Sequence, residues 1–188
     1  MFRDAIYCII RQDDDQISLR CGDRMIDDEK YMKVALVEAQ KAFDLGEVPI
    51  GAILVFEDEV IAVGHNMRET WNDATAHAEM VVIKKACEKL GRWRLSGATL
   101  YVTVEPCPMC AGALVMSRID RVVYGTTDYK AGAVESVFNI VGHQALNHQL
   151  AVTAGVMADE CRLIMQDFFR QRRNAKKQLK KLSLPTQE

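Results

Sequence analysis

Four residues in two short strings constrain this chain more than any other feature of its sequence. One string is His77-Ala78-Glu79, and the other is Pro-Cys-Pro-Met-Cys, which contains Cys107 and ends at Cys110. An imidazole and two thiolates are good zinc ligands, whereas a carboxylate is a good proton carrier. Three protein ligands leave one position on zinc open for water, which is typical of a catalytic site rather than a structural one. The fold must therefore bring both strings to one ion.

Each part of this pattern has a simpler interpretation when it is taken alone. Cys107 and Cys110 could be a redox pair, although their i, i+3 spacing at a helix start also directs both sulfurs to one ion. Glu79 could be a helix-start glutamate favoured by the helix dipole, but it falls on a stripe of core residues, where an unpaired carboxylate is costly. A structural zinc would need a fourth ligand, and Cys87 lies about 15 Å farther along the predicted helix than His77. His65, His143 and His148 remain possible as that ligand, but none of them has the usual ligand spacing.

The composition is that of an ordinary globular protein. The chain has 188 residues, which suggests one domain, and 49% of them are hydrophobic. We find no apolar run of membrane-spanning length and no convincing signal peptide, so we expect a cytoplasmic protein. The six cysteines could form disulfides in a secreted protein, but the Cys-x-x-Cys pair and the lack of a secretory signal favour metal binding.

Basic residues gather near the carboxyl terminus. The formal net charge is −2, yet residues 168–181 contain seven basic residues and no acidic one. Such asymmetry indicates a polyanionic partner, and Phe168 and Phe169 at the start of this stretch could stack on nucleobases. A basic terminal helix can also be no more than a solvated face, with both phenylalanines in the core.

Hydrophobic patterns that alternate between strands and helices predict an α/β sheet covered on both faces. Helices are predicted over 27–45, 76–90 and 158–181, with one more starting at Pro108, and strands over 50–56, 60–64, 99–104, 121–124 and 150–154. A polar loop is predicted over 66–75, and a short helix with a loop over 137–150. We expect one domain over 25–182, an extension of uncertain structure over 1–24 and a frayed tail over 183–188.

His-x-Glu followed by Pro-Cys-x-x-Cys resembles the signature of the cytidine/deoxycytidylate deaminase superfamily, which acts on unstacked nucleobases. Residues 46–52, 75–79, 105–113 and 167–173 further resemble the bacterial tRNA-specific adenosine deaminases, and the likeness covers about residues 27–177. Members of this family convert the wobble adenosine of a tRNA anticodon to inosine. The resemblance implies a three-layer α/β/α cytidine-deaminase-like fold with a central five-stranded mixed sheet flanked by helices. It also implies a homodimer that binds a tRNA anticodon stem-loop.

The resemblance assigns a role to each matching position. His77, Cys107 and Cys110 would hold one Zn²⁺ per subunit, and Glu79 would carry protons. Asn66 would hydrogen-bond the target base, and the loop of Thr127 and Asp128 would approach the neighbouring nucleotides. Together with the basic helix, this predicts that the substrate-binding residues are Asn66, Asp128, Phe168, Arg170, Arg172 and Arg173.

Two other functions fit part of the sequence. A deaminase of a free base or nucleoside, of the guanine or cytosine type, would share the zinc residues but would need no basic helix. A non-catalytic, zinc-stabilised RNA-binding module would bind tRNA without releasing ammonia. Such a module would have no need of Glu79, which favours an enzyme.

Overall fold

A mixed five-stranded sheet forms the centre of the protein. The computed structural model describes residues 9–13, 16–21, 24–25 and 27–182, so the frayed tail predicted over 183–188 lies outside the described residues. The central strands are β4 (Gly51–Phe56), β5 (Glu59–His65), β6 (Ala98–Val104), β7 (Arg121–Thr126) and β8 (Ala151–Ala154). Their order is β5-β4-β6-β7-β8, with antiparallel pairing from β5 to β6 and parallel pairing from β6 to β8. The predicted five-stranded mixed sheet is confirmed.

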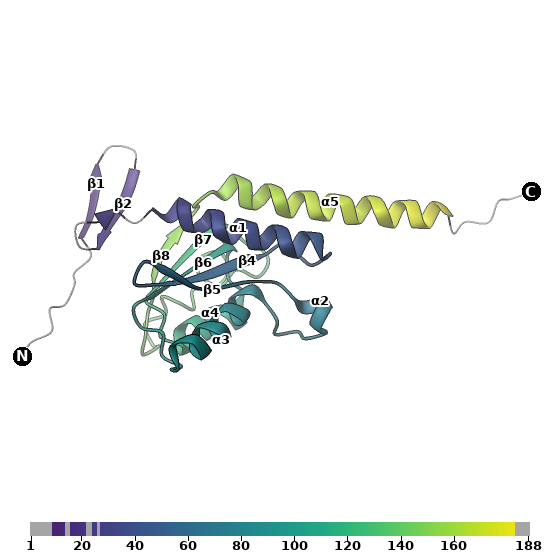
Figure 1. Cartoon of the computed structure of the whole chain (residues 1–188). Helices are drawn as coiled ribbons and strands as arrows, with labels where there is room; N and C mark the ends of the chain where they lie inside the picture. Colours follow the sequence, from purple (N-terminus) through teal and green to yellow (C-terminus); the bar gives the residue numbers. More distant parts are fainter. Residues whose placement is uncertain (1–8, 14–15, 22–23, 26, 183–188) are drawn as a thin grey trace, which may run out of the picture.

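Helices cover both faces of this sheet (Figure 1). On one face lie α1 (Asp28–Asp44) and α5 (Ala158–Leu182), and on the other lie α3 (Ala78–Leu90) and α4 (Pro108–Met116). The Asp27 side chain caps α1 by accepting a hydrogen bond from the Lys30 N–H, and Gly46 beyond its end has φ +78°. Among the described residues, the structure has no helix that is both long and apolar enough to cross a membrane.

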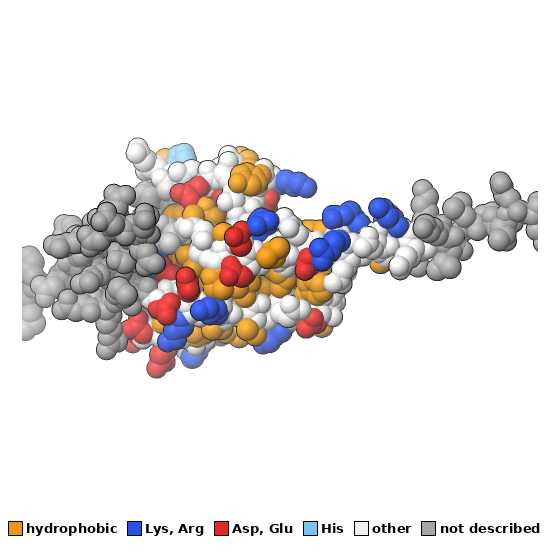
Figure 2. Space-filling model, turned by 90° about the horizontal axis from the view of Figure 1, so that it is seen from above, with side chains coloured by type: hydrophobic (Ala, Val, Ile, Leu, Met, Phe, Trp, Pro, Cys, Tyr) orange, Lys and Arg blue, Asp and Glu red, His pale blue; other side chains and the backbone are white. Residues whose placement is uncertain are grey.

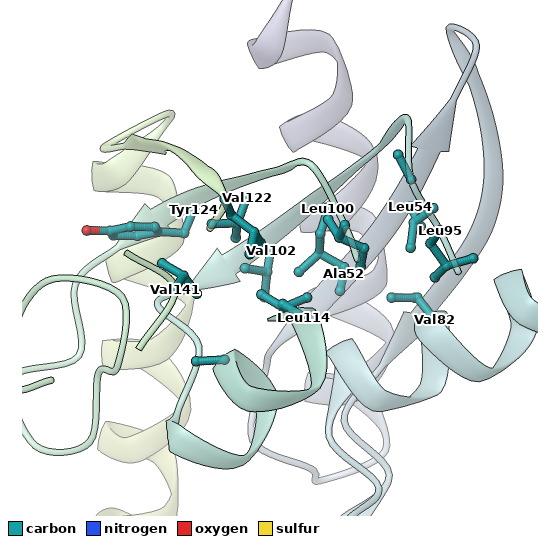
Figure 3. Close-up of a cluster of buried hydrophobic side chains, with 14 of the residues drawn as sticks. Ala52, Leu54, Val82, Leu95, Leu100, Val102, Leu114, Val122, Tyr124 and Val141 are labelled. Atoms are coloured by element: carbon teal, nitrogen blue, oxygen red, sulfur yellow. The ribbon is translucent and has the colours of Figure 1, made fainter. Parts of the chain in front are cut away.

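Two hydrophobic clusters join the three layers. The larger one lies under α3 and α4, where Figure 3 shows side chains of β4, β6 and β7 converging on Val82 and Leu114. The smaller one lies under α1 and α5, where Met32 of α1 and Cys161 of α5 pack with Tyr101 of β6. Both helical layers are therefore held against a rigid sheet, which fixes where their ends lie.

Two segments differ from the sequence prediction, and a third has a structure that the sequence does not predict. The polar loop over 66–75 contains a four-residue helix, α2 (Arg68–Trp71), which a hydrogen bond from the Thr70 N–H to distant Glu47 supports. No helix forms over 137–150, because the side chains of Asn139 and His143 accept hydrogen bonds from N–H groups two or three residues ahead and favour turns. The amino-terminal extension contains an antiparallel sheet of β1 (Ile9–Asp13), β2 (Gln16–Cys21) and β3 (Arg24–Met25).

Gly51 permits the close approach of α1 to the sheet. A Cβ atom at Gly51 would overlap the backbone of Ala35 and Ala39, which cannot move without displacing α1. We expect Gly51→Ala to reduce the free energy of unfolding by about 3 kcal/mol, the upper part of the range for overpacking. Gly112 in α4 is the matched control, because a Cβ there meets no atom within 4 Å. Urea denaturation should show Gly112→Ala at least as stable as the parent, and equal stability of the two variants would contradict the account.

Candidate active site

The two strings found in the sequence meet at the amino-terminal ends of α3 and α4. His77 is the N-cap residue of α3, and Cys107 is the N-cap residue of α4 with Pro108 in its first turn. His77 Nδ1 lies 3.6 Å from the Sγ atoms of both Cys107 and Cys110. The three ligand atoms all lie within 4.8 Å of one another. One imidazole and two thiols from the starts of two helices are thus gathered around one point, as a tetrahedral metal with an open position requires.

The electrostatics of this group favour a bound cation. A hydrogen bond from Cys110, with a further one from His77, lowers the pKa of Cys107 to about 4, so its sulfur is a thiolate at neutral pH. The hydrogen bond to Cys107 and burial raise the pKa of Cys110, which keeps the shared proton. The hydrogen bond to Cys107 raises the pKa of His77. These sulfur and nitrogen atoms compete for protons that one zinc ion would replace.

Glu79 supplies the observation that tests whether a metal fits. Its side chain is almost fully buried, and within the described part of the chain its Oε2 atom has no hydrogen-bond partner. Burial raises the pKa of this carboxyl group. A buried acceptor without a partner is costly unless a cation or its bound water compensates for it. The donor set and this carboxyl group therefore fit zinc together with a water molecule.

Asn66 is held in place by a buried carboxylate that sequence reasoning did not single out. The Asn66 Nδ2 atom donates to Glu47 Oε2 at 3.0 Å, and the Thr70 N–H donates to Glu47 Oε1 at 2.6 Å. Burial alone would raise the pKa of Glu47, but the hydrogen bonds from Thr70 and Glu69 and the charge of Arg68 together lower it. The carboxylate is then an acceptor only, so the Asn66 nitrogen must face Glu47 and its oxygen must face away. The sole sequence signal was a glutamate inside an apolar string.

A groove of about 930 Å³ opens at the end of the sheet where these strings lie. Ile50 and Val104 line it, and they connect it to the site: the Asn66 N–H bonds to the Ile50 carbonyl, and Val104 lies three residues before Cys107. None of the four signature residues lines the groove itself. Its remaining walls are the start of the loop after β7 and one face of α5. The cationic and aromatic side chains that line it are Lys130, Arg162, Arg170, Arg173, Tyr129 and Phe169.

The structure separates the predicted substrate residues on α5 into two faces. Arg170 and Arg173 line the groove, as does Asp128. Phe168 is only 4% exposed and packs edge-on against Phe43 of α1, with ring centroids 5.6 Å apart. Arg172 lies over the Phe168 ring, on the side of α5 that faces the end of α1. The geometry does not support Phe168 as a stacking residue, because α1 covers its ring.

Phe169 is the exposed ring at this point of α5. Its side chain is 41% exposed and lines the groove, opposite the loop that carries Tyr129. The sequence prediction chose Phe168 of the adjacent pair, and helical spacing could have corrected it. Phe169 lies in a stripe with Arg162, Met165 and Arg173, whereas Phe168 lies on the stripe that packs against the body.

The chain is similar to known deaminases along most of its length. The sequence profile of the MafB19-like deaminases matches residues 26–173. A tRNA-specific adenosine deaminase of Bacillus subtilis is 53% identical over 157 residues, which are 84% of this chain and 98% of the relative. A solved structure from a study of A-to-I editing by tRNA:A34 deaminases at the wobble position of transfer RNA has a TM-score of 0.70 and 48% identity, covering 72% of this chain and 98% of its own. The solved structure of guanine deaminase from Bacillus subtilis has a TM-score of 0.53 and 34% identity, covering 67% of this chain and 83% of its own.

Proposed function

The chain belongs to the MafB19-like deaminase family, alongside curated tRNA-specific adenosine deaminases, and we propose that it converts the wobble adenosine of a tRNA anticodon to inosine by zinc-dependent hydrolysis. One observation carries this proposal: the buried Glu79 carboxyl group, whose Oε2 atom has no hydrogen-bond partner among the described residues, lies beside a His/Cys/Cys group at the end of the sheet where a cationic groove opens. The buried carboxyl group beside the His/Cys/Cys group fits hydrolytic deamination, and the cationic groove fits a nucleic-acid substrate.

The four signature residues divide the chemistry between them. His77, Cys107 and Cys110 would hold the zinc ion, which when bound supplies Lewis-acid activation of a water molecule. Glu79 accepts a proton from that water and passes protons to a ring nitrogen and then to the departing amine. Asn66, with its nitrogen bound to Glu47, holds the edge of the target base with its oxygen. Water and adenosine are consumed, and ammonia and inosine are released.

The groove is proposed to bind the anticodon loop around the target nucleotide. An RNA loop offers bases that are readily splayed out, and such bases stack on exposed aromatic rings. Phe169 and Tyr129 provide these rings, and the arginines beside them face the phosphates. Figure 2 shows Lys and Arg side chains gathered where α5 leaves the body of the protein. Phosphate contacts of this kind make binding depend on salt.

Arg173 should contribute one such phosphate contact. It lines the groove and has no ion pair among the described residues, whereas Arg170 is paired with Asp167 at 2.7 Å. We expect Arg173→Ala to weaken binding of an anticodon stem-loop. The logarithm of the association constant should fall less steeply with the logarithm of the salt concentration, by about 0.7 to 1 in slope. Lys33→Ala is the control, because the Lys33 side chain is exposed on α1 outside the groove, and it should leave the slope unchanged. Fluorescence anisotropy over a salt series measures both, and an unchanged slope for Arg173→Ala would remove it from the interface.

Two further parts of the proposal concern assembly and location. We propose a homodimer, as the family resemblance implies, and large exposed hydrophobic side chains such as Met116 and Trp93 are compatible with a partner surface. Sedimentation equilibrium distinguishes a dimer from a monomer.

A tRNA substrate would place the protein in the cytoplasm, which cell fractionation can test.

The substrate is tested with an anticodon stem-loop that carries a wobble adenosine. We expect inosine from this RNA, and no product from free adenosine, guanine or cytidine. Deamination of a free base at a comparable rate would favour the alternative of a small-substrate deaminase. Tight RNA binding without ammonia release would favour a non-catalytic module instead.

A further inference from the structure

Glu105 is a buried carboxylate that the proposed chemistry does not use. Its side chain is 3% exposed and accepts five hydrogen bonds from the loop after β7. Oε1 accepts from the N–H groups of Val134, Glu135 and Ser136 at 3.2, 2.9 and 3.0 Å. Oε2 accepts from the Asp128 N–H at 3.1 Å and from the Ser136 hydroxyl at 2.6 Å. One side chain therefore accepts from four backbone N–H groups, at both ends of the segment 128–136.

Other elements hold the middle of this loop, because Ala133 and Val134 are buried in the larger hydrophobic cluster and the Tyr124 hydroxyl of β7 donates to Glu135 Oε2 at 2.7 Å. At the start of the loop, the Asp128 N–H bonds to Glu105. The Gly132 Cα faces Glu105 so closely that a Cβ would overlap the carboxylate. The Ala133 N–H bonds to the Pro106 carbonyl at 2.8 Å, directly before Cys107. The loop is thus wrapped around the turn that carries a predicted zinc ligand. Because a carboxylate accepts without donating, it suits a nest of converging N–H groups better than any neutral side chain does.

The beginning of this loop is a wall of the groove. Asp128, Tyr129 and Lys130 line it, facing the Phe169 side of α5. The Tyr129 side chain is 85% exposed, so no packing of its own determines where its ring lies. Its position follows from the loop backbone, and the loop backbone is shaped by Glu105.

We propose that Glu105 is a positioning residue for the RNA substrate, which fixes the groove wall of Asp128, Tyr129 and Lys130 at the turn that carries Cys107. This inference rests on the proposed function, because it assigns the groove to RNA. It goes beyond that function by naming a residue outside the predicted site whose loss would impair substrate binding more than chemistry. The loop would still be present without Glu105, but its donors would lack their common acceptor.

Glu105→Gln tests this role with little change of shape. The amide has no charge and turns N–H donors toward backbone N–H groups. We expect hydrogen exchange of residues 128–136 to accelerate about tenfold or more, since hydrogen bonds to a charged group are among the strong ones. The KM for the stem-loop should rise by a similar factor, whereas kcat should fall by less than about threefold. The zinc content should not change. Loss of a residue that merely stabilised the fold would not raise KM while leaving kcat nearly unchanged.

A matched variant separates this effect from the general cost of losing a buried carboxylate. Glu38 is 4% exposed and lies in α1, where its partners are Lys41 and His65. Glu38→Gln should lower the unfolding temperature without a selective acceleration of exchange in 128–136. If both variants accelerate exchange in that loop equally, Glu105 has no special part in holding it.

A double-mutant cycle then tests whether Glu105 affects substrate binding through Tyr129 in the groove wall. Tyr129→Ala should raise KM alone, and Glu105→Gln added to it should raise KM by much less than it does in the parent. Fully additive effects would overturn the proposal, as would unchanged loop exchange in Glu105→Gln. The exchange measurement needs no substrate. A parent protein that makes no inosine would therefore refute the proposed function, whereas the Glu105 inference would be judged separately on exchange and RNA affinity.

Discussion

Replacing Glu79 by glutamine is expected to lower the rate of inosine formation by roughly a hundred- to ten-thousandfold, the range that general acid–base catalysis contributes. The amide keeps the shape of a side chain that is buried beside the His/Cys/Cys group, but it cannot accept and return protons. Zinc should remain bound, because Glu79 is not one of the three gathered ligands. Affinity for the stem-loop should also persist, since Glu79 does not line the groove.

Single-turnover assays, zinc analysis and RNA binding on the same preparation check this result. Glu88 is a matched control because it is an exposed glutamate on the same helix, and Glu88→Gln should deaminate as the parent does. A Glu79→Gln protein with near-normal turnover would remove Glu79 from the chemistry. Loss of zinc from that variant would instead make it a ligand.

Replacing Cys107 by alanine is expected to abolish zinc binding and reduce activity to background. The variant leaves two ligands, His77 and Cys110, and two ligands hold zinc far more weakly than three. Because a metal that binds only the folded state stabilises it, added zinc should raise the unfolding temperature of the parent but not that of Cys107→Ala. The loss of the thiolate should therefore appear in metal content, activity and thermal stability together.

Cys87 provides the control for this substitution. Its thiol lies near the carboxyl end of α3, is half-buried and contacts the Trp93 carbonyl, outside the ligand group. Cys87→Ser should retain one zinc per subunit and normal turnover. Full zinc occupancy in Cys107→Ala, measured by elemental analysis after gel filtration, would contradict the ligand assignment.

The sequence was sufficient for features that depend on short strings. Asp27 and Gly46 mark the ends of α1 through local hydrogen bonding and a left-handed backbone, so the helix over 27–45 was predictable. The signature around His77 and Cys107 likewise needs only a few adjacent residues. These local patterns, with the family resemblance, were enough to predict the layers of the fold and the gathering of one imidazole and two thiols.

Features that depend on distant partners were not predictable in this way. Nothing near α2 in the sequence reveals that Glu47 accepts the Thr70 N–H and orients Asn66. Glu105 is one residue before a proline, and only the folded chain brings the loop donors of residues 128–136 to it. The choice between Phe168 and Phe169 differs from these two cases, because helical spacing along α5 could have identified Phe168 as the ring that packs against α1. Glu47 and Glu105 thus owe their roles to contacts between segments that are far apart in the sequence.

The source of the oxygen in the product tests the central claim most directly. The anticodon stem-loop with a wobble adenosine is incubated with the zinc-loaded protein in water labelled with heavy oxygen, and the nucleosides are analysed by mass spectrometry. Hydrolytic deamination predicts inosine at the wobble position with heavy oxygen on its ring, together with one equivalent of ammonia. An RNA that is bound but keeps its adenosine, or inosine without the label, would contradict the account.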